Sequence, residues 1–74
     1  MEEINKILMD VFKLPLEEIE NDLSMNDVDN WDSLSHMNLI VQIEDACSIE
    51  LSGDDIAEMT SFEAIRKIVT KYLN

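Results

Sequence analysis

The sequence of 74 residues has few of the residue types that several kinds of functional site require. It contains one cysteine, which excludes an internal disulfide framework and a cysteine-rich zinc site. It has 5 basic residues against 17 acidic ones, and the formal net charge of −12 would repel nucleic acids and anionic lipid head groups. No run approaches the ~18 consecutive apolar residues of a membrane span. The charge therefore favours basic protein surfaces as partners.

The chain does have enough apolar residues, 46%, to fold despite its charge. Its length is that of a single domain, residues 1–74, in which folding buries only about 60–65% of the unfolded surface. So small a domain has no room for a deep cleft with many catalytic groups. The sequence begins Met1-Glu2-Glu3 and lacks the basic region of a secretory signal, so we expect a cytoplasmic protein.

Apolar residues recur at helical spacing in three long segments, residues 2–13, 33–47 and 61–73. A short helix is expected within residues 52–59. The long loop, residues 14–32, shows no sustained period, but its scattered apolar residues indicate that it packs onto the helices. The sequence therefore predicts an all-α fold. This fold is a small four-helix bundle with three longer helices, a short third helix and a long loop between helices one and two.

Two local patterns add detail to this prediction. Pro15 suits the first turn of a helix, so a one-turn helix is expected over residues 15–19. Thr60 and Glu63 have the spacing of a capping box at the start of the last helix.

The segment 33–47 carries apolar residues on two sides of the predicted helix. A wide core stripe consists of Leu39, Ile40, Ile43, Ala46 and Cys47. A second stripe lies on the opposite side and consists of Leu34, Met37 and Val41, bordered by Glu44 and Asp45. Either the long loop or the short helix covers the second stripe, or the stripe is an apolar docking surface with an acidic rim for a basic partner.

Asp32 and Ser33 stand at the start of this helix. Asp32 suits the N-cap and Ser33 the first turn, which is a common arrangement without any function. An exposed serine beside the second stripe also suits the attachment of a phosphorylated group, because helix-terminal N–H groups favour phosphate. No His–Asp relay or oxyanion motif surrounds Ser33, so we do not expect a catalytic serine.

With these residues in place, the whole sequence resembles the acyl carrier protein family. The resemblance is centred on Asp32-Ser33-Leu34 and continues along the helix to Glu44-Asp45. It implies a stand-alone carrier in which Ser33 receives a 4'-phosphopantetheine arm from coenzyme A and Asp32 supports the modification. The thiol of the arm would hold acyl intermediates as thioesters and deliver them to partner enzymes of fatty-acid, polyketide or related biosynthesis. The carrier itself would be no enzyme, with no catalytic residue and no metal.

The resemblance also implies how the carrier meets its partners. The second stripe would form the apolar part of the docking surface. Glu44 and Asp45 would pair with Arg or Lys on a phosphopantetheinyl transferase and on acyl-loading, condensing or transferase enzymes. The carrier would be a monomer without nucleic acid or membrane partners. A long acyl chain could slip between the helices, into a cavity lined by Leu39, Ile43, Ile56, Ile65 and Ile68.

The residues around Ser33 depart from the fatty-acid type of carrier. Ser35, His36 and Asn38 stand where such carriers usually have acids, which favours a specialised pathway. Two alternatives remain open. The chain is a peptidyl or aminoacyl carrier, or it is a non-enzymatic helical adaptor that uses the second stripe and carries no substrate.

The other notable residues have simpler interpretations. His36 is expected to be a partly solvated helix residue, because a lone imidazole lacks a second ligand or a relay partner. Cys47 is expected to be a buried small residue of the core stripe. Trp31 is expected to anchor the long loop on the second long helix, with contact to an arm or partner as the alternative. The acidic run 27–32 lacks the Gly that a calcium-binding EF-hand loop requires.

Overall fold

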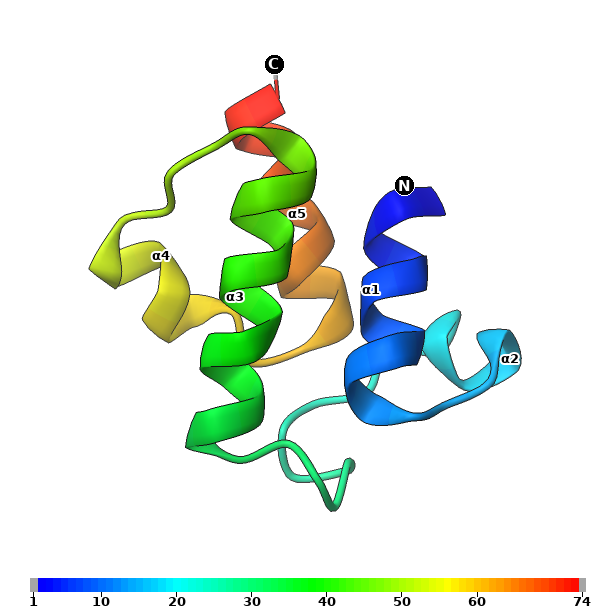
Figure 1. Cartoon of the computed structure of the whole chain (residues 1–74). Coiled ribbons are helices and arrows are strands. Elements are labelled where there is room, and N and C mark those ends of the chain that lie inside the picture. Colours follow the sequence, from blue (N-terminus) through cyan, green and yellow to red (C-terminus); the bar gives the residue numbers. More distant parts are fainter. Residues whose placement is uncertain (1, 74) are drawn as a thin grey trace.

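The computed structural model describes residues 2–73 and is all-helical within them (Figure 1). Its helices are α1 (Glu2–Phe12), α2 (Leu16–Ile19), α3 (Ser33–Cys47), α4 (Gly53–Glu58) and α5 (Phe62–Leu73). The predicted bundle of three longer helices and one short helix is confirmed, and the one-turn helix expected after Pro15 is α2. Pro15 itself takes the N-cap position with an extended backbone.

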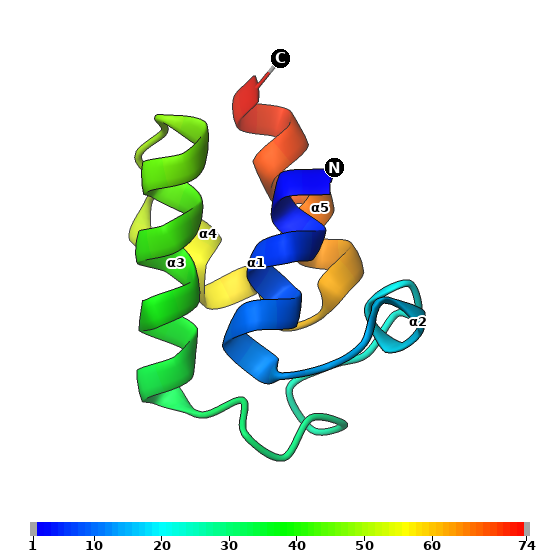
Figure 2. The same ribbon diagram turned by 45° about the vertical axis from the view of Figure 1, so that its right-hand side comes forward.

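The three long helices α1, α3 and α5 stand side by side and enclose the core (Figure 1). The short helix α4 lies against α3, on the side of α3 away from α1. Figure 2 shows α2 on the far side of α1 from α3, and the long loop runs from α2 back to the start of α3. The start of α3 therefore receives the chain directly from the long loop.

The core is a single cluster of apolar side chains to which every long helix contributes. The side chains with no exposed surface are Leu8, Ile19, Leu39, Ile43, Met59, Phe62, Ile65 and Val69. Full burial of an aliphatic or aromatic side chain of this size stabilises a fold by about 1.5–3 kcal/mol. The core stripe of α3 is buried at Leu39, Ile40 and Ile43, whereas Ala46 is exposed and Cys47 is half-buried, so the predicted stripe was too wide at its C-terminal end.

The start of α5 differs from the predicted capping box by one residue. The Ser61 hydroxyl oxygen accepts a hydrogen bond from the Ala64 N–H at 3.1 Å, so Ser61 is the cap and Thr60 is not. The Glu63 N–H donates to the carboxylate of Asp22 in the long loop at 3.1 Å. The helix start is thus satisfied by a residue distant in the sequence, which a local capping pattern cannot reveal.

The long loop is tied to α5 by backbone hydrogen bonds on both sides of an isolated bridge between Ser24 and Ser61. The Met25 N–H donates to the Thr60 carbonyl and the Phe62 N–H donates to the Leu23 carbonyl, both at 2.9 Å. These contacts hold the loop against the bundle, so the residues that lead into α3 are placed by the fold.

Candidate functional site

Ser33 is the first residue of α3, and its side chain is exposed. Asp32 occupies the N-cap, and its carboxylate oxygen Oδ1 accepts a hydrogen bond from the Ser35 N–H at 2.8 Å. This hydrogen bond, with a smaller contribution from the Ser35 side chain, lowers the pKa of Asp32 below its ordinary value. Asp32 is therefore ionised near neutral pH and fixed in place one residue before the Ser33 hydroxyl. The N-cap prediction is confirmed.

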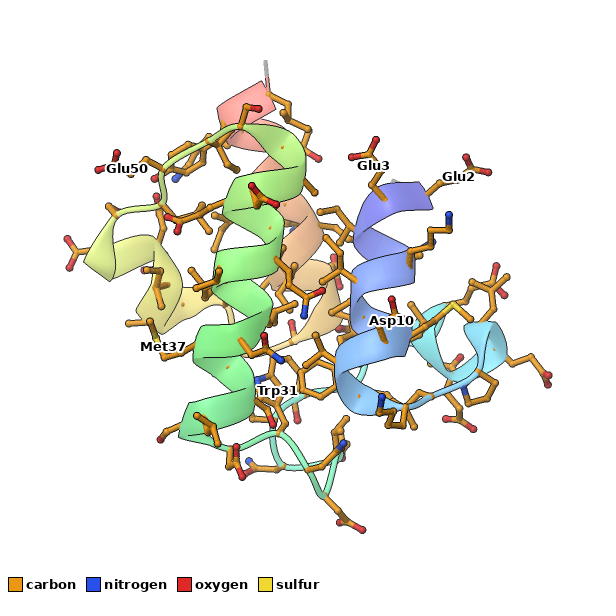
Figure 3. The ribbon with its side chains drawn as sticks, viewed as in Figure 1. Glu2, Glu3, Asp10, Trp31, Met37 and Glu50 are labelled. Atoms are coloured by element: carbon orange, nitrogen blue, oxygen red, sulfur yellow. The ribbon has the colours of Figure 1, made fainter. Side chains whose placement is uncertain are left out.

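The second stripe of α3 is uncovered along its length. The exposed fractions are 81% for Leu34, 50% for Met37 and 58% for Val41. Figure 3 shows Met37 projecting from the side of α3 that is turned away from α1. A shallow hollow of about 520 Å³ lies on this face and is lined by Leu34, Ser35, Met37, Asn38 and Val41. Neither the long loop nor α4 covers the stripe, so that interpretation was wrong.

The two acids at the C-terminal border of the stripe have different surroundings. Glu44 is half-buried, and its Oε2 accepts a hydrogen bond from the Leu51 N–H at 2.8 Å. The Glu44 carbonyl also accepts from the Ile49 N–H at 3.2 Å. Asp45 is exposed. Glu44 therefore holds the turn that follows α3, whereas the Asp45 carboxylate faces solvent beside the second stripe.

A third acid, Asp55 of α4, joins that helix to α5. Its Oδ1 lies 3.0 Å from the Lys71 ammonium, and its Oδ2 accepts a hydrogen bond from the Tyr72 hydroxyl. The Tyr72 oxygen in turn accepts from the Ser52 N–H at 3.1 Å. The hydrogen bond from Tyr72, followed by that from Lys71, lowers the pKa of Asp55. This carboxylate has a structural role between two helices.

Trp31 and His36 form a contact that the sequence interpretation missed. Trp31 is 4% exposed, which confirms it as an anchor of the long loop. Its indole Nε1–H donates to Nδ1 of His36 at 3.0 Å, and the His36 Nε2 lies 2.9 Å from the Ile56 carbonyl oxygen of α4. His36 is half-buried and connects two elements, so it is more than a solvated helix residue. A buried indole N–H needs an acceptor, and this requirement is the signal that could have identified the pair.

Cys47 lies at the opposite end of α3 from Ser33. Burial, with a smaller effect from the Glu3 carboxylate, raises the pKa of its thiol. The thiol therefore stays protonated near neutral pH and is a poor nucleophile.

Two further features concern the whole of the chain that the structure describes. Within residues 2–73, no group of three or more His, Cys, Asp or Glu side chains is arranged to hold a metal ion. None of the helices from α1 to α5 is long and apolar enough to cross a membrane.

The fold and these residues agree with the result of a comparison with protein families. The model of a family described as a phosphopantetheine attachment site matches residues 2–69, which is nearly all of the chain from α1 into α5. The class is thus that of phosphopantetheine carriers, and the chain belongs to this family. No curated protein matches the sequence.

Membership defines what the protein does in general terms. Domains of this family are the sites at which 4'-phosphopantetheine is attached covalently, and they carry it without catalysing a reaction themselves. Such a carrier interacts with a phosphopantetheinyl transferase and with biosynthetic enzymes.

Proposed function

We propose that the protein is an acyl carrier protein in which the Ser33 hydroxyl bears the 4'-phosphopantetheine arm. The observation that supports this most strongly is the position of Ser33, exposed at the first residue of α3, next to the uncovered second stripe. The Ser33 oxygen bonds to the phosphorus next to the pantetheine arm, the pyrophosphate bond of coenzyme A breaks, and adenosine bisphosphate and the hydroxyl proton are released. Asp32, ionised and held by the Ser35 N–H, supports this modification.

The start of α3 fits the phosphate of the arm. The free N–H groups and the dipole of a helix N-terminus stabilise a nearby negative charge. Three other serines have hydroxyl groups that serve the fold. Ser24 donates to Asp27, and the hydroxyl oxygens of Ser52 and Ser61 accept the N–H groups at the starts of α4 and α5. Ser33 has no such contact within residues 2–73, so its modification disrupts no hydrogen bond there.

The second stripe is the proposed docking surface for the enzymes that load and use the arm. Leu34, Met37 and Val41 are available to an apolar partner surface, because aliphatic side chains this exposed gain free energy when a partner covers them. Asp45 supplies a free carboxylate for an Arg or Lys of a basic partner patch. Glu44 can also bind such a partner residue, through Oε1, because its Oε2 accepts from the Leu51 N–H.

The cargo is an acyl group held as a thioester, in fatty-acid, polyketide or related biosynthesis in the cytoplasm, and the carrier acts as a monomer. Ser35, His36 and Asn38 after Ser33, where fatty-acid carriers usually have acids, favour a specialised pathway. A peptidyl or aminoacyl cargo is the closest alternative, because the same arm and the same helix would carry it.

Mass spectrometry tests the attachment site directly. The purified apo protein is incubated with coenzyme A and a broad-specificity phosphopantetheinyl transferase, and its intact mass is measured. We expect the wild type and the matched control Ser35→Ala to gain one phosphopantetheine group, and Ser33→Ala to gain none. A gain that persists in Ser33→Ala would move the site to another residue. The absence of any gain in the wild type would favour the helical adaptor.

A further inference from the structure

Ser33 lies next to two boundaries between elements of the fold, which we call seams. A cargo on the arm could enter the core only through one of these seams. One seam separates the first turn of α3 from the long loop and the aromatic side chains behind it. The other separates α3 from α4, which lies against it (Figure 1). An apolar acyl chain gains free energy by leaving water, so it would enter the core wherever a seam is open.

The seam toward the long loop is closed by packed aromatic rings. The centroid of the buried Trp31 ring lies 4.8 Å from that of Phe12 and 5.5 Å from that of Phe62. Figure 3 shows Trp31 at the start of α3, directed toward α1. The Asn30 amide also donates to the Phe12 carbonyl at 3.2 Å, which ties the loop to the end of α1. The rings pack into the space between the start of α3 and α1, and the hydrogen bond holds the loop there.

The seam toward α4 is bridged by the His36 ring. An indole N–H can only donate, so Nδ1 of His36 accepts the hydrogen bond from Trp31. The proton of the neutral ring is then on Nε2, which donates to the Ile56 carbonyl of α4 at 2.9 Å. His36 lies one helical turn after Ser33, so the bridge crosses the seam directly beside the proposed attachment point.

The core behind the bridge is filled. Leu39 and Ile43 of α3 have no exposed surface, and neither do Met59, after α4, or Ile65 of α5. Protein interiors of this kind are close-packed, so a long chain could enter only by separating α3 from α4. Separation would break the hydrogen bond from the His36 ring to the Ile56 carbonyl of α4.

We propose that His36 is a positioning residue that keeps α4 closed against α3 and so keeps the cargo outside the core. This inference rests on the proposed attachment at Ser33. It assigns to the carrier a short or polar acyl group, because such a group loses little by remaining in water. It also reverses the expectation that a long acyl chain slips into the core beside Leu39 and Ile43.

Carriers loaded with cargo of different lengths test this proposal. The apo protein is loaded by the broad-specificity transferase from acetyl, octanoyl and dodecanoyl coenzyme A. The rate of thioester cleavage by hydroxylamine and the Tm are then measured for each. We expect the same rate and the same Tm for all three cargoes. Each methylene that entered the core would favour the buried form about fourfold, so slower cleavage and a higher Tm with dodecanoyl would overturn the proposal.

Variants of His36 identify the residue responsible. In His36→Ala, we expect cleavage to slow and Tm to rise as the cargo lengthens, because nothing bridges the seam. Gln can accept from Trp31 and donate to α4, so His36→Gln should behave like the wild type. The matched control Gln42→Ala, a half-buried α3 residue whose amide donates to Asn38 of the same helix, should also do so.

Other outcomes of these experiments are equally decisive. A His36→Ala carrier without length dependence would remove the assignment to His36. A wild-type protein that takes up no acyl group would overturn the attachment at Ser33 as well, whereas loaded carriers with length-dependent cleavage would overturn only the closed seam.

Discussion

The core stripe and the second stripe of α3 are built from the same kinds of apolar residue but have opposite surroundings. On the core stripe, the side chains with at most 1% exposure are Leu39, Ile40 and Ile43. On the second stripe, the side chains with half or more of their surface exposed are Leu34, Met37 and Val41. Folding accounts for the core stripe alone. The second stripe keeps half or more of its surface in water, which is why we propose that it meets partners.

The largest expected effect is on stability, and it separates the two stripes. Leu39→Ala removes a fully buried side chain, so the free energy of unfolding should fall by about 2–5 kcal/mol. Leu34→Ala, the matched change on the second stripe, should stay within about 0.5 kcal/mol of the wild type. Urea unfolding followed by circular dichroism measures both. Equal losses in the two variants would contradict the division of α3 into two stripes.

The next effect is on modification by the transferase. Val41→Asp places a charge in the middle of the second stripe, so the KM of the transferase for the carrier should rise about tenfold, the equivalent of about 1.4 kcal/mol of lost docking energy. The urea midpoint should remain that of the wild type, because Val41 is exposed. Thr70→Asp, an equally charged change at an exposed position of α5, is the control. An unchanged KM in Val41→Asp would remove the second stripe from the docking surface.

The sequence predicted most of this comparison, because both stripes follow from helical periodicity alone. The bounds of α3 were predicted from Asp32 and the apolar spacing, and the structure reproduces them from Ser33 to Cys47. Periodicity alone left open whether another element covers the second stripe, since a covering element can come from anywhere in the chain. That question needed the three-dimensional positions of α4 and the long loop.

Side-chain hydrogen bonds between distant residues were beyond the reach of the sequence. The bond from the Leu51 N–H to Glu44 spans the turn after α3, and the bridge from His36 to Ile56 joins α3 to α4. Such contacts depend on where two elements come together, and no local pattern encodes that. Glu44 and Asp45 consequently looked equivalent in the sequence, although the structure gives them different surroundings.

A smaller effect should distinguish these two acids. Glu44→Ala removes a carboxylate that binds a backbone N–H, so the free energy of unfolding should fall by about 1 kcal/mol. Asp45→Ala should leave stability within about 0.5 kcal/mol and raise the transferase KM instead, as expected for an exposed acid beside the second stripe. Urea unfolding and steady-state kinetics of both variants make the comparison. A greater loss of stability in Asp45→Ala than in Glu44→Ala would reverse the assignment.

The smallest expected effect concerns acids away from α3 and depends on pH. The pKa of Asp55 in the folded protein lies below its ordinary value of 3.8, mainly because of the hydrogen bond from Tyr72. Its ionised form therefore stabilises the fold above that pH, and this stabilisation is lost as the pH falls through the lower, folded value. Asp55→Asn should lower the urea midpoint near neutral pH, and its difference from the wild type should shrink on acidification through this range. Asp54→Asn, an exposed neighbour on α4, should show no such trend. If the difference in urea midpoint between Asp55→Asn and the wild type were the same near neutral pH and after acidification, the negative charge of Asp55 would not be what joins α4 to α5.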